Sequence, residues 1–248
     1  MMKISIIGNG AMALSIAKGL PKDIEIEVVG KDEQKLQRFC DEIGCKYSLL
    51  QGYDIQDKDI ILAVKPYALQ NVAQKCVGKA NVIYSVLAGI HIAQLHQIKA
   101  SYYVRTMPNV GATYNASTTS LTGDSEYKTQ AMELFGAIGK TFWVEDENQL
   151  DIATAIAGCG PAFLALAAEA MSDGAVKCGM NRALANELVA SNFYSFAPLI
   201  ANEHPALIKD KITSPGGTTI EGVKALEEYG ARFAFFKAVE NAFAKLKK

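Results

Sequence analysis

The sequence predicts an α/β protein in which an N-terminal, doubly wound (Rossmann-type) parallel sheet precedes an all-helical C-terminal part. Over residues 1–147, short apolar runs rich in β-branched residues alternate with amphipathic helical stretches, as in a sheet with helices on both faces. Beyond residue 148 the strand pattern stops and alanine-rich helical runs follow. No polar linker separates residues 1–147 from 148–248, so we expect two tightly joined domains with this boundary.

Each element of the first part is predicted by its periodicity. The predicted strands are Lys3–Ile7, Ile24–Val29, Asp59–Val64, Val82–Leu87 and Tyr102–Thr106, with Ser117–Leu121 and Lys140–Val144 extending the sheet. The predicted helices are Ala11–Leu20, Glu33–Ile43, Tyr67–Cys76 and Glu126–Phe135.

In the second part the predicted helices are Leu150–Ala157, Ala162–Lys177, Ala183–Ile200, Ile220–Glu228 and Arg232–Lys247. Pro161 suits the first residue of a helix. Residues 152–171 are apolar enough to mimic a membrane span. Because alanine dominates this run and Gly158–Pro161 interrupts it, we expect a buried pair of soluble helices instead.

Composition excludes several classes of function. The chain has 25 basic and 26 acidic residues with no charged block, so no nucleic-acid partner is expected. Five cysteines without Cys-x-x-Cys spacing and three scattered histidines predict no metal site. The N-terminus lacks the pattern of a signal peptide, and no membrane association is expected. These features predict a reduced, cytoplasmic protein.

A dinucleotide site is predicted at the first strand–helix junction. The run Gly8-Asn9-Gly10-Ala11-Met12-Ala13 has the form G-x-G-x-x-A, in which the glycines permit the turn and the approach of a pyrophosphate. We therefore expect residues 8–12 to bind the cofactor.

Lys31 follows the second strand, where a 2′-phosphate would lie, so we expect NADPH to be the preferred cofactor and NADH to remain possible. Asp32 is expected to cap the next helix, and a solvated Lys-Asp turn is the alternative.

A small-anion site is predicted near the C-terminus, in the run Thr213–Glu221 (TSPGGTTIE). Thr218-x-x-Glu221 has capping-box spacing, which places a helix start at Thr218 or Thr219 with Thr218 as the cap. The glycines let the backbone approach a ligand, and free N–H groups at the helix start favour an anion. The predicted substrate-binding residues are Ser214, Gly216, Gly217, Thr218 and Thr219, and an ordinary capped turn is the alternative.

Residues Pro205–Glu227 resemble the C-terminal signature of the pyrroline-5-carboxylate reductases. Ala63-Val64-Lys65-Pro66, Ser85–Ile90 and Val104–Asn109 also resemble family segments. The resemblance implies that Val64, Lys65, Pro66, Ala88 and Asn109 lie beside the cofactor, and that the Thr219 hydroxyl contacts the substrate ring nitrogen as the catalytic group. Cys159 and Phe163 stand where family members carry serine and tyrosine.

The resemblance implies a reaction and an assembly. Hydride would pass from NAD(P)H to the C=N bond of 1-pyrroline-5-carboxylate, giving L-proline in the last step of proline biosynthesis. Family members dimerise through their helices, so a homodimer or higher homo-oligomer is expected. One alternative is a related reductase of another imine or of a hydroxy acid, although residues 153–166 lack the catalytic lysine of hydroxy-acid enzymes. The other is a non-catalytic dinucleotide sensor.

Overall fold

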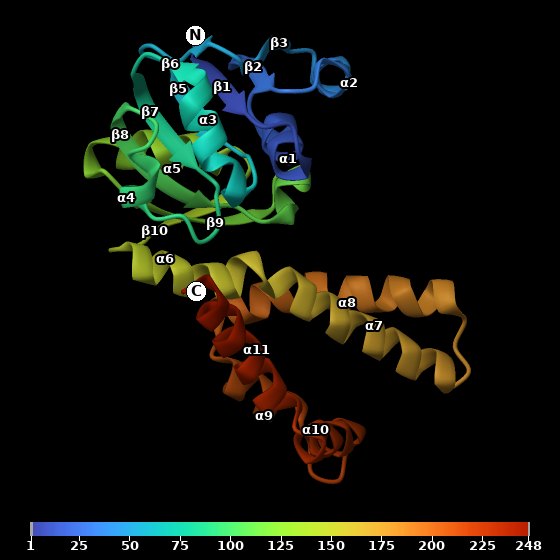
Figure 1. The fold of residues 1–248 in the computed structure, drawn as a ribbon. Helices are drawn as coiled ribbons and strands as arrows, with labels where there is room; N and C mark the ends of the chain where they lie inside the picture. Colours follow the sequence, from blue (N-terminus) through green and yellow to red (C-terminus); the bar gives the residue numbers. More distant parts are fainter. Residues whose placement is uncertain (1, 248) are drawn as a thin grey trace. The chain divides into compact units, whose positions relative to one another are not determined.

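The computed structural model describes residues 2–247 and forms two compact units (Figure 1). The first unit holds the chain up to Cys159 together with residues 242–247, and the second holds Gly160–Asn241. These compact units are not a test of the predicted domains, so the domain boundary after residue 147 stays a prediction.

The first unit is built on an eight-stranded sheet with the order β10-β9-β8-β7-β5-β1-β2-β3. These strands are β1 (Lys3–Ile7), β2 (Glu25–Gly30), β3 (Lys46–Leu49), β5 (Asp59–Leu62), β7 (Ala80–Ser85), β8 (Ala100–Met107), β9 (Ser117–Gly123) and β10 (Gly139–Trp143). The sequence prediction missed β3, and it missed two short strands, β4 (Tyr53–Asp54) and β6 (Cys76–Val77), which pair separately. The doubly wound fold is confirmed.

One pair of strands breaks the parallel pattern. β9 runs antiparallel to β8, whereas β10 is parallel to β9. Only the short 3₁₀ segment η2 (Val110–Tyr114) joins β8 to β9. A parallel crossover needs a connection of a dozen or more residues, so this link can only return the chain in the opposite direction. The predicted strands at 117–121 and 140–144 therefore do extend the sheet, but in reverse orientation.

Helices cover both faces of the sheet. Buried side chains of α1, α2 and α5 pack on one face, and those of α3 and α4 pack on the other. The bounds are α1 (Ala11–Gly19), α2 (Glu33–Ile43), α3 (Leu69–Lys75), α4 (Ile92–Leu95), α5 (Lys128–Gly136) and α6 (Glu147–Ala153). Short 3₁₀ segments precede α3 (η1, Pro66–Ala68) and α5 (η3, Ser125–Tyr127). The sequence prediction missed α4, which has a single turn and so little periodicity.

The helices of the C-terminal part are α7 (Gly160–Lys177), α8 (Arg182–Asn202), α9 (Pro205–Ile212), α10 (Thr218–Glu228) and α11 (Ala231–Leu246). α7 and α8 form an antiparallel hairpin in which the Ser172 hydroxyl donates to Asn186 and accepts from Arg182. All were predicted except α9, whose eight residues carry a weak apolar pattern.

A continuous helical run extends over Glu147–Lys177, with mean hydropathy 1.7 in its most apolar window. The expected break at 158–161 is reduced to one turn residue, Cys159, between the π-helix η4 (Thr154–Gly158), which follows α6, and the start of α7. Pro161 is the second residue of α7 rather than the first. These helices were expected to be buried, and within a single chain this prediction is wrong, since only 22% of the apolar window is buried. By length and composition alone this run could cross a membrane.

The second unit has almost no buried core of its own. Among residues 160–241 only Ser172, Ala185 and Ile208 are buried. Large apolar side chains are instead exposed along its helices, including Leu166, Leu226 and Phe236 at 69%, 62% and 65%. Monomeric proteins rarely leave so much apolar surface in water.

Two buried tyrosines of the first unit differ in their hydrogen bonding. The Tyr53 hydroxyl donates to Glu27 (2.5 Å) and accepts from the Lys58 ammonium (2.9 Å). The Tyr84 hydroxyl has no hydrogen-bond partner among residues 2–247. Burial raises the pKa of Tyr84 well above its ordinary value, so the group stays a neutral phenol without a partner.

We expect Tyr84→Phe to keep or raise the free energy of unfolding by up to about 1 kcal/mol, because it removes a polar atom that is desolvated without compensation. Tyr53→Phe should lower the same quantity by roughly 1–2 kcal/mol, because it leaves Glu27 short of a donor. Urea denaturation of both variants checks the contrast. A larger loss for Tyr84→Phe than for Tyr53→Phe would contradict it.

Candidate functional site

The glycine-rich turn between β1 and α1 is built on a close backbone contact. Gly8 has φ +120°, and its N–H donates to the Val29 carbonyl at 2.8 Å. A Cβ on Gly8 would overlap the Ala63 carbonyl of the adjoining loop. Only glycine fits at this position, so the turn draws together the ends of three adjacent strands, β1, β2 and β5.

The second glycine faces open space. A Cβ on Gly10 would meet nothing within 4 Å, and Gly10 begins α1 without any side-chain cap. The Asn9 amide nitrogen is buried and has no partner within the described part of the chain. Uncapped backbone N–H groups at a helix start, an unpaired amide and free space above the backbone fit a pyrophosphate. The residues present therefore suit a dinucleotide.

The acid that follows β2 caps the next helix, as expected. Asp32 is the N-cap of α2, and its carboxylate accepts from the Lys35 backbone N–H at 3.1 Å and lies 3.6 Å from the Lys35 ammonium. Lys31 is exposed beside it. Asp32 thus caps its own helix, and a role for Lys31 in cofactor binding stays a prediction.

The loops singled out by the resemblance lie along the same sheet edge. Val64, Lys65 and Pro66 follow β5, and Ala88 follows β7. β5 lies between β1 and β7 in a parallel arrangement, so all these loops leave the carboxyl ends of neighbouring strands. Ligands of open α/β sheets bind at that edge. Lys65, Pro66 and Ala88 are exposed there.

Asn109 has structural contacts of its own. Its side chain accepts from the Gly111 N–H and donates to the Ala157 carbonyl in η4, both at 2.9 Å. Its backbone N–H donates to the Ser117 hydroxyl. Asn109 therefore holds η2 and the π-helix in place, and a direct contact with a cofactor stays a prediction.

The predicted substrate loop lies in the second unit. The capping box predicted there is absent. α10 begins at Thr218, as expected, but its N-cap is Gly217 (φ −82°, ψ 170°), and no side chain caps it. The Gly217 N–H donates to the Ser214 carbonyl at 3.0 Å, and this turn starts the helix one residue earlier. Thr218 and Thr219 are therefore the first two helical residues, and Thr218 is not the cap.

A buried ionic cluster at the end of β8 was missed in the sequence. Arg105 is fully buried; its guanidinium donates to Asp151 at 2.9 Å and to Glu147 at 3.0 Å, both on α6. Glu147 also accepts from the Ile92 N–H at 2.9 Å, and the His91 ring lies 3.3 Å away. Two features of the sequence could have indicated this cluster. Arg105 is the one charged residue in an apolar strand, and Glu147 and Asp151 are acids four residues apart.

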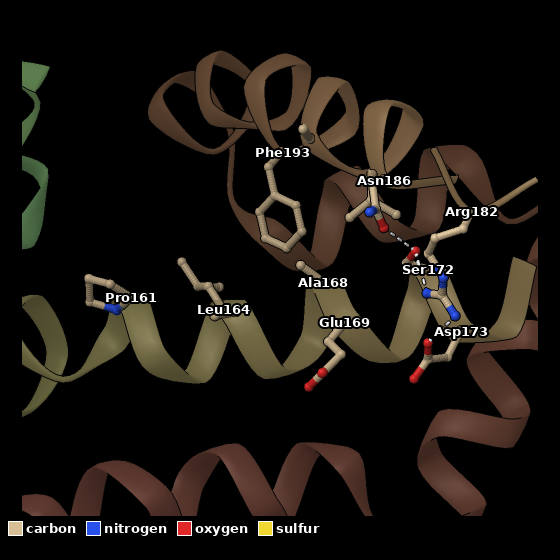
Figure 2. A pocket seen from close by; sticks show the side chains of 12 residues that line it. Pro161, Leu164, Ala168, Glu169, Ser172, Asp173, Arg182, Asn186 and Phe193 are labelled. Atoms are coloured by element: carbon tan, nitrogen blue, oxygen red, sulfur yellow. Dashed lines mark hydrogen bonds and ion pairs between the residues drawn. The ribbon is translucent and has the colours of Figure 1, made fainter. Parts of the chain in front are cut away.

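A cleft in the second unit is lined by other residues. A cavity of about 640 Å³ lies between α7 and α8. Figure 2 shows its polar end, where Asn186, Ser172, Arg182 and Asp173 are linked in a chain. None of the predicted site residues lines it. The described residues hold no cluster of potential metal ligands.

Comparison with known proteins matches this arrangement to one family. A family model for pyrroline-5-carboxylate reductase dimerisation matches residues 147–248, and one for NADP oxidoreductase, coenzyme F420-dependent, matches residues 3–89. The pyrroline-5-carboxylate reductase of Synechocystis is 34% identical over 98% of this chain and 97% of its own length. The chain belongs to the pyrroline-5-carboxylate reductase family.

Solved reductases of this family share the fold. The Streptococcus pyogenes enzyme superposes with a TM-score of 0.88 at 30% identity, covering 99% of this chain and 98% of its own. The Plasmodium falciparum enzyme, solved with NADP bound, gives 0.83 at 27% identity and covers 99% and 97%. A curated relative from Methanosarcina acetivorans is 33% identical over 99% of this chain and 97% of its own length.

We expect Arg105→Met to lower the free energy of unfolding by about 3–5 kcal/mol, because it leaves the buried Asp151 carboxylate without a counter-charge. Arg38→Met, which changes an exposed arginine on α2, should change it by less than about 0.5 kcal/mol. Thermal and urea unfolding measure both. Equal stability of the two variants would show that the cluster contributes nothing.

Proposed function

We propose that this chain catalyses the reduction of 1-pyrroline-5-carboxylate to L-proline with NAD(P)H. The observation that carries the proposal is the sheet edge: Gly8, Gly10, Lys31, Lys65 and Ala88 come from four adjacent strand ends. The reductase relatives, which span almost the whole chain, support the same reaction.

The reduced nicotinamide supplies a hydride when bound. A cyclic imine protonated on nitrogen is already an electrophile, so the protein has mainly to orient it and exclude competing water. This requirement agrees with a site that holds no paired general acid and base among the predicted residues. Because the Gly217 N–H is bonded to the Ser214 carbonyl, the backbone amides of Thr218 and Thr219 at the start of α10 would bind the substrate carboxylate, and the Thr219 hydroxyl would hydrogen-bond the ring nitrogen.

The direct test is oxidation of NADPH by the purified chain with pyrroline-5-carboxylate, followed by loss of reduced-nicotinamide absorbance and by detection of proline. The control reactions supply an open-chain imine or a 2-hydroxy acid with NADP. Turnover of a control substrate alone would indicate a related reductase. Binding of NADPH without turnover of any imine would indicate a sensor.

We propose that Lys31 selects NADPH over NADH. Lys31→Ala should weaken NADPH by about 1–2 kcal/mol, the contribution of one charge-assisted contact to the 2′-phosphate, and leave NADH nearly unchanged. Lys22→Ala, in the loop before β2 at the opposite sheet edge, is the charge-matched control. Titration with both cofactors measures the effect, and an equal loss for the two would exclude this role.

Thr219→Val preserves the shape of the side chain and deletes its hydroxyl. If the hydroxyl holds the substrate nitrogen, kcat/KM should fall roughly 10- to 100-fold while NADPH affinity and Tm stay the same. Thr218→Val is the matched control, because neither threonine caps α10. Unchanged kinetics in Thr219→Val with a fall in Thr218→Val would move the contact to the neighbouring residue.

We infer a homodimer or higher homo-oligomer formed through the helical part. The exposed apolar side chains of residues 160–241 need a cover, and the family model matched there is one for dimerisation. Sedimentation should give at least twice the 26.7 kDa of one chain. A stable and active species with the mass of a single chain would contradict the inference.

A further inference from the structure

Two cysteines that lie five positions apart meet at the end of α2. Cys40 is in the last turns of the helix, and Cys45 follows Gly44, which has the left-handed conformation (φ 77°, ψ 39°). Five positions along a straight helix would place the two side chains on different faces. Gly44 reverses the backbone and its N–H donates to the Cys40 carbonyl at 2.7 Å, so Cys45 folds back onto the helix.

The two thiols are in contact. Their sulfurs are 3.0 Å apart, about 1 Å more than the length of a disulfide bond. No other pair of cysteine sulfurs makes a hydrogen-bond contact within residues 2–247, and Cys76, Cys159 and Cys178 are also free thiols. The backbone reversal has therefore already brought this one pair close to bonding range.

The pair has one accessible and one protected sulfur. Cys45 is half-buried and lines a surface cavity of about 640 Å³ together with Lys18, Glu42 and Lys46. Cys40 is 6% exposed and packs in the core beneath it. Burial, and then the contact with Cys45, raise the pKa of the Cys40 thiol to about 12, so Cys40 stays protonated at neutral pH. A small oxidant reaches Cys45 first.

We propose that Cys40 and Cys45 form a reversible modification site, an intrachain disulfide made by hydrogen peroxide or another small peroxide. The Cys45 thiolate attacks an oxygen of hydrogen peroxide, the O–O bond breaks, and the leaving hydroxide takes up the proton that the thiol released, so that a sulfenic acid and water result. The Cys40 sulfur then attacks the Cys45 sulfur, the S–O bond breaks, and the hydroxyl leaves as water with the Cys40 proton. Two thiols and one hydrogen peroxide thus give one disulfide and two waters (another peroxide gives its alcohol or acid and one water), and an added dithiol reverses the change.

The site is separate from the cofactor edge. Cys45 immediately precedes β3, and β3 runs parallel to β2, whose far end carries Lys31. The disulfide therefore forms at the amino ends of these strands, and it can be tested independently of the proposed reduction.

The test uses the full chain treated with stoichiometric peroxide, denatured with an alkylating agent and digested with trypsin. Cleavage after Arg38 and Lys46 releases Phe39–Lys46, which contains both cysteines. We expect the oxidised peptide to carry no alkyl group and to have two hydrogens fewer than the dithiol peptide, and to carry both alkyl groups when dithiothreitol precedes alkylation. The Cys178 peptide (residues 178–182) has one cysteine and serves as the control for general oxidation.

Two variants identify the order of events. In Cys45→Ser, Cys40 should remain alkylatable, with its oxidation slowed roughly tenfold or more because it is buried and protonated. In Cys40→Ser, Cys45 should accumulate as a sulfenic acid that dimedone traps. Full alkylation of Phe39–Lys46 while Cys178 is oxidised would overturn the proposal, as would disulfides of Cys45 with other chains in place of the internal bond.

Discussion

A buried guanidinium governs how the end of β8 joins the helices that follow. Arg105 has no exposed surface, so its charge must be neutralised within the protein. Asp151 and Glu147 of α6 provide the two carboxylates, and Glu147 also accepts from the backbone before α4. Three elements distant in sequence are thereby held by one positive charge. Asn109 continues this role by joining η2 to η4.

The cofactor edge depends on a second constraint, which is steric rather than electrostatic. Gly8 lies so close to the loop after β5 that no side chain fits between them. The close approach aligns the ends of β1, β2 and β5 along one edge, while Asp32 caps α2 and Lys31 is exposed beside it. The edge is therefore formed by backbone geometry, and side chains add selectivity to it.

Periodicity in the sequence was sufficient for most of the architecture, because the buried strands and the amphipathic helices have regular patterns. It could not give the reversed direction of β9, since strand direction depends on the connection rather than on the strand. The capping box failed because a turn at Ser214–Gly217 supplied an N-cap one residue earlier. Arg105 was missed because its partners lie more than 40 positions away. The roles of the individual site residues, Thr219 above all, stay predictions.

The π-helix at Thr154–Gly158 has a consequence for the register of the long helical run. A π-turn is equivalent to one extra residue accommodated within an α-helix without breaking it. One residue corresponds to about 100° of rotation about the helix axis. A helical wheel drawn continuously from Glu147 to Lys177 therefore assigns the later side chains to the wrong direction. The α6 and α7 segments need separate wheels, and deletion of a single residue here would rephase one against the other.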